Sequence, residues 1–230
     1  MGLDGNTNDL VIVQNGGYLT MLDGSRITGH TNSGTSAASG AGAAVNVGGN
    51  GTFTMSGGII TGNTATAVSA NTDISGGVFL LNASSHFIMT GGRIYGNYRA
   101  DGVTADVFIS AAVNHFTLSG DARIGRLILS ATTTGNSFIT VGSDWSGGVA
   151  YLDLRTNATS LGSAMTDWTG NRVLQAEGNH SFTTADLGRL NLNMARFIGN
   201  AEGVTQPVSQ AHSIVLEDSN TVGRLRATNP

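Results

Sequence analysis

The chain contains no cysteine, only two prolines and no lysine among its 11 basic residues. The lack of cysteine excludes disulfides and thiolate metal sites. The lack of lysine excludes motifs that require one, such as the phosphate-binding Gly-x-x-x-x-Gly-Lys, and we expect no nucleotide cofactor. Scarce proline, together with glycines that do not recur at every third position, excludes a collagen-like chain.

Charge is also scarce, at 11% of the 230 residues with a net charge of −4. Such a chain lacks the clustered basic face that nucleic-acid binding requires. No apolar run approaches the roughly 18 residues of a membrane-spanning helix, so we expect no membrane span in this chain. The first five residues contain neither a basic nor an apolar leader segment, so the chain either stays inside the cell or has lost a leader.

Glycine, by contrast, is abundant: the chain has 34, where average usage predicts roughly 16. Many of these glycines belong to four similar segments, at residues 18–29, 52–63, 86–97 and 115–125. Their anchor residues lie 34, 34 and 29 residues apart, and are Met21, Met55, Met89 and Leu118. A second apolar segment precedes each of the four at a constant distance. A register kept at two places in each unit indicates a structural repeat of about 29–34 residues.

Each unit contains three short strand-like pieces separated by glycine, asparagine, serine and threonine. Pieces this short predict one turn of a coil, with the next unit stacked about 4.8 Å away along the axis. The expected fold is therefore an all-β, right-handed parallel β-helix forming a single elongated domain. The residues expected to stack in its core are Leu19, Met21, Phe53, Met55, Phe87, Met89, Phe116, Leu118, Ile27, Ile60, Ile94 and Ile124.

Glycine and asparagine recur where the predicted coil has to turn. The pairs Gly57–Gly58 and Gly91–Gly92 occupy equivalent corners, where glycine reaches a positive φ without a clash. Asn63 and Asn97 follow a glycine at the next corner. Asparagine tolerates the left-handed conformation, and its amide can form hydrogen bonds along a stack. We expect all six residues to be structural.

The repeat weakens beyond residue 130, although strand-like pieces continue to residue 216. We therefore expect regular coils over residues 1–130, and less regular coils with a C-terminal cap over residues 131–230. A separate small domain after about residue 160 is the alternative.

The motif at 52–63 and 86–97, x-Phe-(Thr/Ile)-Met-(Ser/Thr)-Gly-Gly-x-Ile-x-Gly-Asn, resembles repeats of bacterial right-handed β-helix proteins. These are adhesin-like surface proteins with the pectin-lyase-like fold, and the resemblance covers roughly residues 8–125. It implies an extracellular or cell-surface location and usually no enzymatic activity. The segment at 17–29 departs from the motif, which leaves the geometry of its corner open.

The same fold also carries polysaccharide lyases and hydrolases, so the sequence has to be searched for catalytic groups. Asn71–Asp73 matches one tripeptide of polygalacturonase-like enzymes, but their other motifs are missing. In the predicted register no two acidic residues stack on adjacent coils at the spacing that a glycosidase needs. The histidines show no metal-site spacing. We therefore expect no catalytic residue, metal or cofactor.

One outward column contains a surplus of arginine and aromatic residues. Each arginine of this column precedes an inward isoleucine, and the histidines lie one strand away in adjacent coils. Guanidinium groups beside aromatic rings can bind a glycan. The alternative is that the arginines only cover apolar edges. The candidate glycan-binding face comprises Arg26, Arg93, Arg123, Tyr95, Tyr98, His86 and His115.

The function expected from the sequence is a non-enzymatic module of a cell-surface or secreted protein, serving as a stalk or adhesin segment. Its expected partners are a glycan or a host surface protein. The alternatives are a polysaccharide lyase or hydrolase of the pectin-lyase-like fold, and a fibre subunit that associates end to end or laterally through exposed strand edges.

Overall fold

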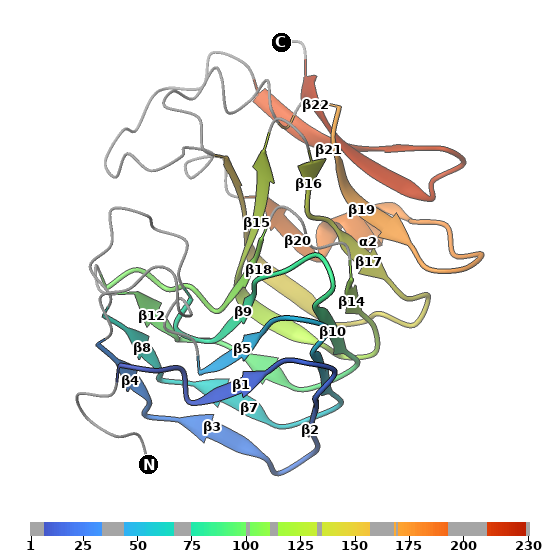
Figure 1. The fold of residues 1–230 in the computed structure, drawn as a ribbon. Helices are drawn as coiled ribbons and strands as arrows, with labels where there is room; N and C mark the ends of the chain where they lie inside the picture. The colour runs from blue at the N-terminus through green and yellow to red at the C-terminus, as the bar shows by residue number, and fades with distance from the viewer. Residues whose placement is uncertain are drawn as a thin grey trace.

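The structure, a computed structural model, is a parallel β-solenoid of about four turns (Figure 1). It describes residues 7–33, 44–66, 75–99, 102–110, 115–132, 135–156, 168, 170–192 and 211–228. The prediction of an all-β chain whose repeats stack as a parallel solenoid is confirmed. Among the described residues no helix is long and apolar enough to cross a membrane.

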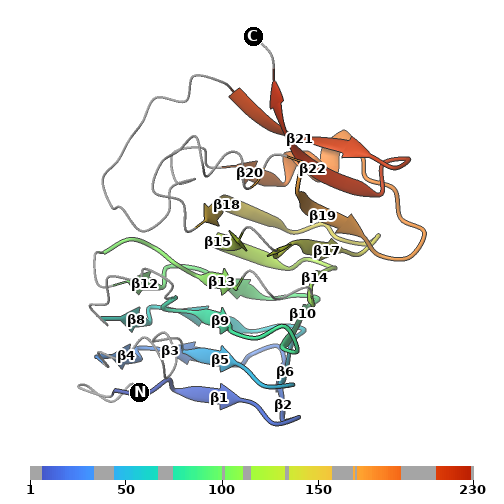
Figure 2. The same ribbon diagram turned by 45° about the horizontal axis from the view of Figure 1, so that its top comes forward.

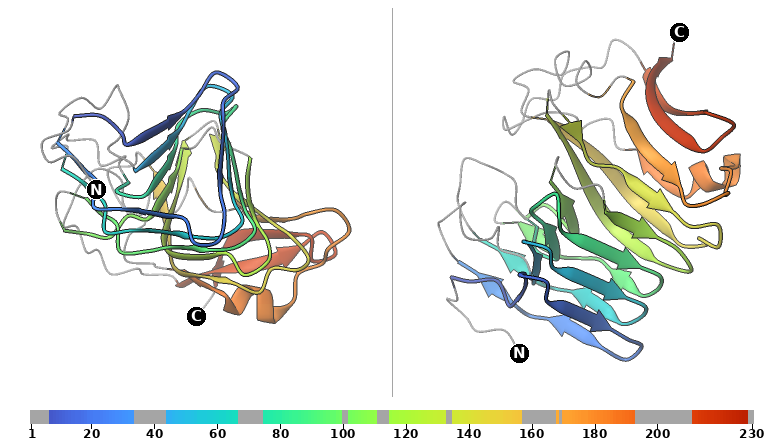
Figure 3. Two further views of the ribbon diagram at one scale, coloured as in Figure 1. Left: turned by 90° about the horizontal axis from the view of Figure 1, so that it is seen from below. Right: turned by 45° about the vertical axis from the view of Figure 1, so that its right-hand side comes forward.

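Three walls enclose the core, and each of the first three coils contributes one strand to each wall in the same order (Figure 2). The first wall begins with β1 (Val11–Val13), β5 (Val45–Val47), β9 (Val78–Leu80) and β13 (Val107–Ile109). The second wall contains β2 (Tyr18–Met21), β6 (Thr52–Met55), β10 (His86–Met89), β14 (Phe116–Leu118), β17 (Ile139–Val141) and β19 (Arg172–Ala176). The third wall begins with β3 (Arg26–Thr28), β7 (Ile59–Thr61) and β11 (Arg93–Ile94). Seen end-on, the coils have a three-sided outline (Figure 3, left).

The strands pair in register, so equivalent residues of successive coils stack directly on one another. Phe53 pairs with Leu19 on one side and with Phe87 on the other, and Phe87 pairs with Phe116. Outward positions of these strands carry threonine, histidine or isoleucine, which gives the alternating burial pattern of β6 and β10. The sequence alternation therefore places two apolar columns inside the second wall, one through Phe53 and one through Met55.

The core is filled by stacked side chains of the same kind. The ring centroids of Phe53 and Phe87 lie 4.8 Å apart with planes 6° from parallel, and those of Phe87 and Phe116 lie 5.3 Å apart. Every residue expected in the core lies in one apolar cluster, but Leu19 and Ile27 of the first coil are only partly buried. They lie in the terminal strands of their sheets, so no described coil covers them from below.

A short fourth side leaves the corner between the third and first walls in the first three coils. It contains β4 (Thr31–Asn32), β8 (Thr64–Ala65) and β12 (Tyr98–Arg99), which form a separate three-stranded sheet, here called the side sheet. The left-handed residues at this corner are Gly62 and Gly96, not the asparagines that follow them. Asn63 and Asn97 are fully buried, and they act through their amides.

These amides form a ladder along the solenoid axis. The Asn63 Oδ1 accepts a hydrogen bond from the His30 N–H at 3.0 Å, and the Asn63 Nδ2 donates to the Asn97 Oδ1 at 2.8 Å. The Asn97 Nδ2 in turn donates to the Asp106 carboxylate at 2.9 Å. Burial raises the pKa of Asp106, although hydrogen bonds from Asn97 and Arg126 and the charge of Arg126 oppose the shift.

Among the described residues the side sheet has no strand after β12. The following coils take a shorter path from the third wall to the first wall. In the next coil β15 (Arg123–Thr132) runs directly from the third wall into the first wall, pairing with β11 through its start and with β13 through Leu127–Leu129. β18 (Gly148–Thr156) repeats this path, and β20 (Leu190–Leu192) pairs with both parts of β18. β16 (Gly135–Asn136) folds back on the end of β15.

The two ends of the solenoid differ. At the C-terminal end β22 (Val222–Thr228) pairs antiparallel with β19 and with β21 (Ala211–Glu217), and this hairpin closes the second wall (Figure 3, right). The short helix α2 (Thr184–Gly188) lies just before β20. At the other end β1, β2, β3 and β4 are terminal strands of their sheets within the described residues.

Candidate functional site

The outer face of the third wall presents two columns of side chains on either side of an inward apolar column. The inward column continues from Ile124 to Val149 and Leu190. The column before it contains Arg26, Ile59, Arg93, Arg123, Gly148 and Arg189. The column after it contains Thr28, Thr61, Tyr95, Gly125 and Ala150, and Asn191 of β20 follows where the pairing of β18 with β20 shifts register.

A groove of about 550 Å³ lies on this face, over the part of the wall where the columns change from large to small residues. We call it the arginine groove. Three arginines, a tyrosine and an asparagine are its large polar side chains, and its lining residues are Arg93, Ile94, Tyr95, Arg123, Ile124, Gly125, Gly148, Val149, Ala150, Gly188, Arg189 and Asn191.

The floor of the groove exists because three adjacent outward positions carry almost no side chain. Gly148 and Ala150 are the two outward residues of the same stretch of β18, and Gly125 lies beside Ala150 on β15. A Cβ at Gly125 would lie 2.5 Å from the Asp106 Oδ2, so the carboxylate that ends the amide ladder approaches too closely for a side chain here. Ala150 is exposed, and its methyl group faces outward.

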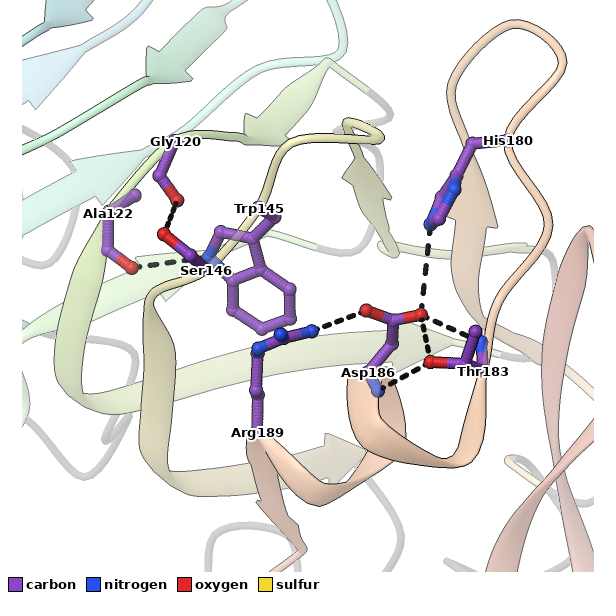
Figure 4. Close-up of polar contacts among 8 residues, drawn as sticks. All are labelled: Gly120, Ala122, Trp145, Ser146, His180, Thr183, Asp186 and Arg189. Carbon is purple, nitrogen blue, oxygen red and sulfur yellow. Dashed lines mark hydrogen bonds and ion pairs between the residues drawn. The ribbon is translucent and has the colours of Figure 1, made fainter.

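The corner that leads into β18 is tied to the coil below it. The Trp145 indole Nε1 donates to the Ala122 carbonyl at 3.2 Å, and the Ser146 hydroxyl donates to the Gly120 carbonyl at 3.1 Å (Figure 4). The Trp145 side chain is buried, so its apolar ring and its hydrogen bond both hold this corner. These contacts fix where β18, the floor of the groove, begins.

Arg189 reaches the groove from the C-terminal end of α2, where a carboxylate orients it. Thr183 and Asp186 form a capping box at the start of α2, and the Asp186 carboxylate makes an ion pair with the Arg189 guanidinium. His180 lies on the far side of this carboxylate, with its Nε2 3.9 Å from the Asp186 Oδ2 (Figure 4). One Asp186 oxygen therefore pairs with Arg189, and the other accepts hydrogen bonds from Thr183 at the helix cap.

The electrostatics around Asp186 favour its ionised form. Burial alone would raise the pKa of this carboxyl. Hydrogen bonds from Thr183, together with the charges of Arg189 and His180, outweigh burial and leave the pKa below its ordinary value. Asp186 is therefore ionised at neutral pH, where it pairs with the Arg189 guanidinium.

The structure brings together part of the predicted glycan-binding face. Arg93, Tyr95 and Arg123 line the groove, whereas Arg26 stands in the same column on β3, two strands beyond β11. Tyr98 belongs to β12 in the side sheet and is not among the residues that line the groove. Sequence reasoning missed Arg189 and Asn191, because the register of the repeat could not be followed past residue 130.

The two histidines of the predicted face lie on the second wall, apart from the arginines. The imidazole centroids of His86 and His115 are 4.2 Å apart and their planes are 12° from parallel. Nitrogen lone pairs lie in the ring planes, so two stacked rings do not converge on one metal ion. Burial, and then the charge of His115, lower the pKa of His86.

No group of three or more His, Asp or Glu side chains in the described part of the chain is arranged to hold a metal ion. Asp106 is buried in the amide ladder, and Asn71–Asp73 lies outside the described residues. Comparison with models of protein families, with curated proteins and with solved structures finds no match to this chain. The class defined by the fold is the parallel β-solenoid.

Proposed function

We propose that this chain is a non-enzymatic β-solenoid module of a secreted or cell-surface protein and that it binds a glycan in the arginine groove. The observation that carries the proposal is the groove itself, which interrupts the outward columns of large side chains at Gly125, Gly148 and Ala150. The solenoid supplies a rigid scaffold, and the resemblance to bacterial adhesin-like β-helix proteins supports the extracellular location.

The chemistry of the lining suits a saccharide. Tyr95 is half exposed and offers a ring face for the apolar side of a sugar. Asn191 offers both a donor and acceptor for hydroxyl groups, and each guanidinium offers a planar set of donors. Because the other side chains project from paired strands and Asp186 pairs with Arg189, their spacing is set before a ligand arrives and little ordering is needed on binding.

The test is a panel of immobilised glycans probed with the wild-type protein and with Ala150→Trp. The Ala150 side chain points outward, so an indole there fills the groove without entering the core. We expect wild type to bind at least one glycan and Ala150→Trp to lose that binding. Thr28→Trp, in the same column on β3 but outside the groove, is the matched control and should bind normally. Binding that Ala150→Trp leaves unchanged would contradict the proposal.

The non-enzymatic part of the proposal has its own test. Any glycan that binds should be recovered intact after long incubation with the protein, with no new reducing ends and no unsaturated products. Turnover of a bound glycan would instead support the alternative of a polysaccharide lyase or hydrolase of the pectin-lyase-like fold.

Exposed apolar residues on the first coil favour a second candidate function, end-to-end self-association. Four large apolar side chains are exposed there, at Leu10, Ile12, Tyr18 and Leu22. Tyr18 is the most exposed of them, at 83%, and it lies in the terminal strand β2. Unpaired strand edges can add strands from another molecule. Sedimentation velocity over a range of concentrations tests this, and a monomer at all concentrations would remove it.

A further inference from the structure

We infer that the arginine groove binds a saccharide that carries an anionic group, a carboxylate or a sulfate, with this group over Gly148 and the sugar ring over Ala150. This inference rests on the proposed function and deepens it, because it names the ligand's charge and its orientation. Three features of the groove lead to it: its width, the difference between its two ends, and its charge.

The width of the groove follows from the pairing of the strands. β18 forms the floor, β15 lies on one side and β20 on the other. Adjacent strands are about 4.8 Å apart, so the strands that flank the groove are separated by about 10 Å. Both outward positions of this part of β18 are small, at Gly148 and Ala150. An extended ligand therefore lies along β18, across the solenoid axis.

The two ends of the groove differ in chemistry. Gly148 lies in the column that contains Arg123 and Arg189, so an arginine stands on each side of it. Ala150 lies in the other column, where Tyr95 stands beyond Gly125 on one side. On the other side β20 brings Asn191 to the groove, at the point where its pairing with β18 shifts register. One end thus offers guanidinium groups, and the other offers an aromatic ring and an amide. An anionic substituent matches the first end, and a pyranose ring matches the second.

The charge of the groove is positive although the whole chain is negative. The lining residues include three arginines and no Asp or Glu. No ion pair joins Arg93 or Arg123 to another residue of the described part of the chain. Arg189 shares Asp186, but a guanidinium has five N–H donors and one carboxylate does not use them all. With a net charge of −4 overall, attraction of an anion has to be local to the groove.

Arg189 has the geometry of a positioned anion-binding group. Its carboxylate partner is itself held by the Thr183 backbone N–H at 2.7 Å and by the Thr183 hydroxyl at 2.8 Å. Because the arginine is fixed before binding, its remaining donors need no reordering when an anion arrives. Arg123 on the opposite side is exposed, so it can close over the same anion.

The experiment measures the affinity of the full chain for three defined probes: hyaluronan oligosaccharides, which carry carboxylates, dextran sulfate, and neutral dextran. The variants are Arg123→Gln, Ala150→Trp and the matched control Arg26→Gln. Arg26 belongs to the same column, so its loss changes the net charge equally but lies outside the groove. Thermal unfolding of each variant verifies that the fold is retained.

We expect at least one anionic probe to bind, dextran to bind far more weakly, and Arg123→Gln to lose about 10- to 100-fold in affinity for the anionic probe. Arg26→Gln should stay within about twofold of wild type, and whichever anionic probe binds identifies a carboxylate or a sulfate as the ligand group. An equal loss in Arg26→Gln and Arg123→Gln would overturn the inference.

The outcomes also separate this inference from the proposed function. If dextran bound as tightly as the anionic probes and Ala150→Trp abolished that binding, glycan binding in the groove would stand and the anionic specificity would be wrong. If no probe and no glycan of the wider panel bound, both would be wrong.

Discussion

The Asp106 Oδ1 accepts hydrogen bonds from both the backbone N–H and the side-chain Nδ2 of Asn97, at 2.8 and 2.9 Å. Its other oxygen, Oδ2, accepts from the Arg126 N–H at 2.7 Å. The side chain of each asparagine in the ladder accepts a hydrogen bond from the preceding coil and donates one to the following coil. The last member receives donors from both sides, so it has to be a residue whose two side-chain oxygens both accept.

Replacement of Asp106 by asparagine is therefore expected to destabilise the protein. The new Nδ2 would face either Asn97 donors or the Arg126 N–H, leaving a buried donor without an acceptor at a cost of about 1–3 kcal/mol. Removal of a buried charge offsets part of this cost, so we expect a net loss of about 1 kcal/mol and a fall in Tm of about 2–4 °C. Asp121→Asn, at an exposed position, is the control. An unchanged Tm for Asp106→Asn would contradict the account of the ladder.

Two coil corners allow the effect of close stacking on the coil below to be separated from the effect of backbone strain. Gly58 and Gly24 have nearly the same positive φ, 85° and 80°. A Cβ at Gly58 would lie 2.6 Å from the Ser25 carbonyl oxygen of the coil below, whereas nothing lies within 4 Å of a Cβ at Gly24. Alanine at either position costs about 1 kcal/mol from the left-handed backbone. We expect Gly58→Ala to lower the free energy of unfolding by clearly more than Gly24→Ala, as measured by urea denaturation. Equal losses would show that the coils separate easily at this corner.

The first four coils could be predicted because each repeats an apolar anchor at the same distance from a glycine corner. Met21, Met55 and Met89 predict the register that the strand pairing shows. The later coils could not be aligned in this way. Once Asp106 ends the ladder, β15 passes through the corner without a turn, and the period shortens.

For the same reason, only the part of the candidate site that belongs to the regular repeats could be predicted from the sequence. Arg93 and Arg123 belong to regular repeats, so their shared column could be read from the sequence. Arg189 enters the column from α2, a helix with no counterpart in the other coils. Gly148 looks in the sequence like an isolated corner glycine, and only its pairing with Arg123 shows that it forms the floor of a groove.

The stacked histidines predict a measurable coupling between two titrations. The pKa of His86 is lowered by burial and then by the charge of His115. In His115→Gln the second cause disappears, so the pKa of His86 should rise toward its ordinary value. NMR titration of the imidazole resonances measures this, with His30 as the internal control, because its pKa is lowered mainly by burial.

The same shift has a consequence for stability. A histidine whose pKa is lowered in the folded state binds fewer protons than in the unfolded chain, so its contribution is present above the ordinary histidine pKa and is lost as the pH falls. The loss of Tm on acidification should therefore be smaller in His115→Gln than in wild type. A His86 that titrates identically in both proteins would mean that the rings do not sense each other's charge.

The stacked phenylalanines couple neighbouring coils, and Phe87 is the middle member of that stack. It is fully buried and contacts an aromatic ring in the coil on each side. Phe87→Ala should lower the free energy of unfolding by about 3–5 kcal/mol through lost burial and a cavity.

Since each coil contacts only its neighbours, the cavity should also weaken the coupling between the coils on either side of it. Hydrogen exchange should then show β2 and β6 losing protection before β17 and β19. Ile88→Thr, on the outward face of the same strand, matches the threonines it pairs with at Thr54 and Thr117, and should change stability by no more than about 0.5 kcal/mol. Uniform loss of protection along the whole solenoid in Phe87→Ala would instead mean that the chain unfolds as a single cooperative unit.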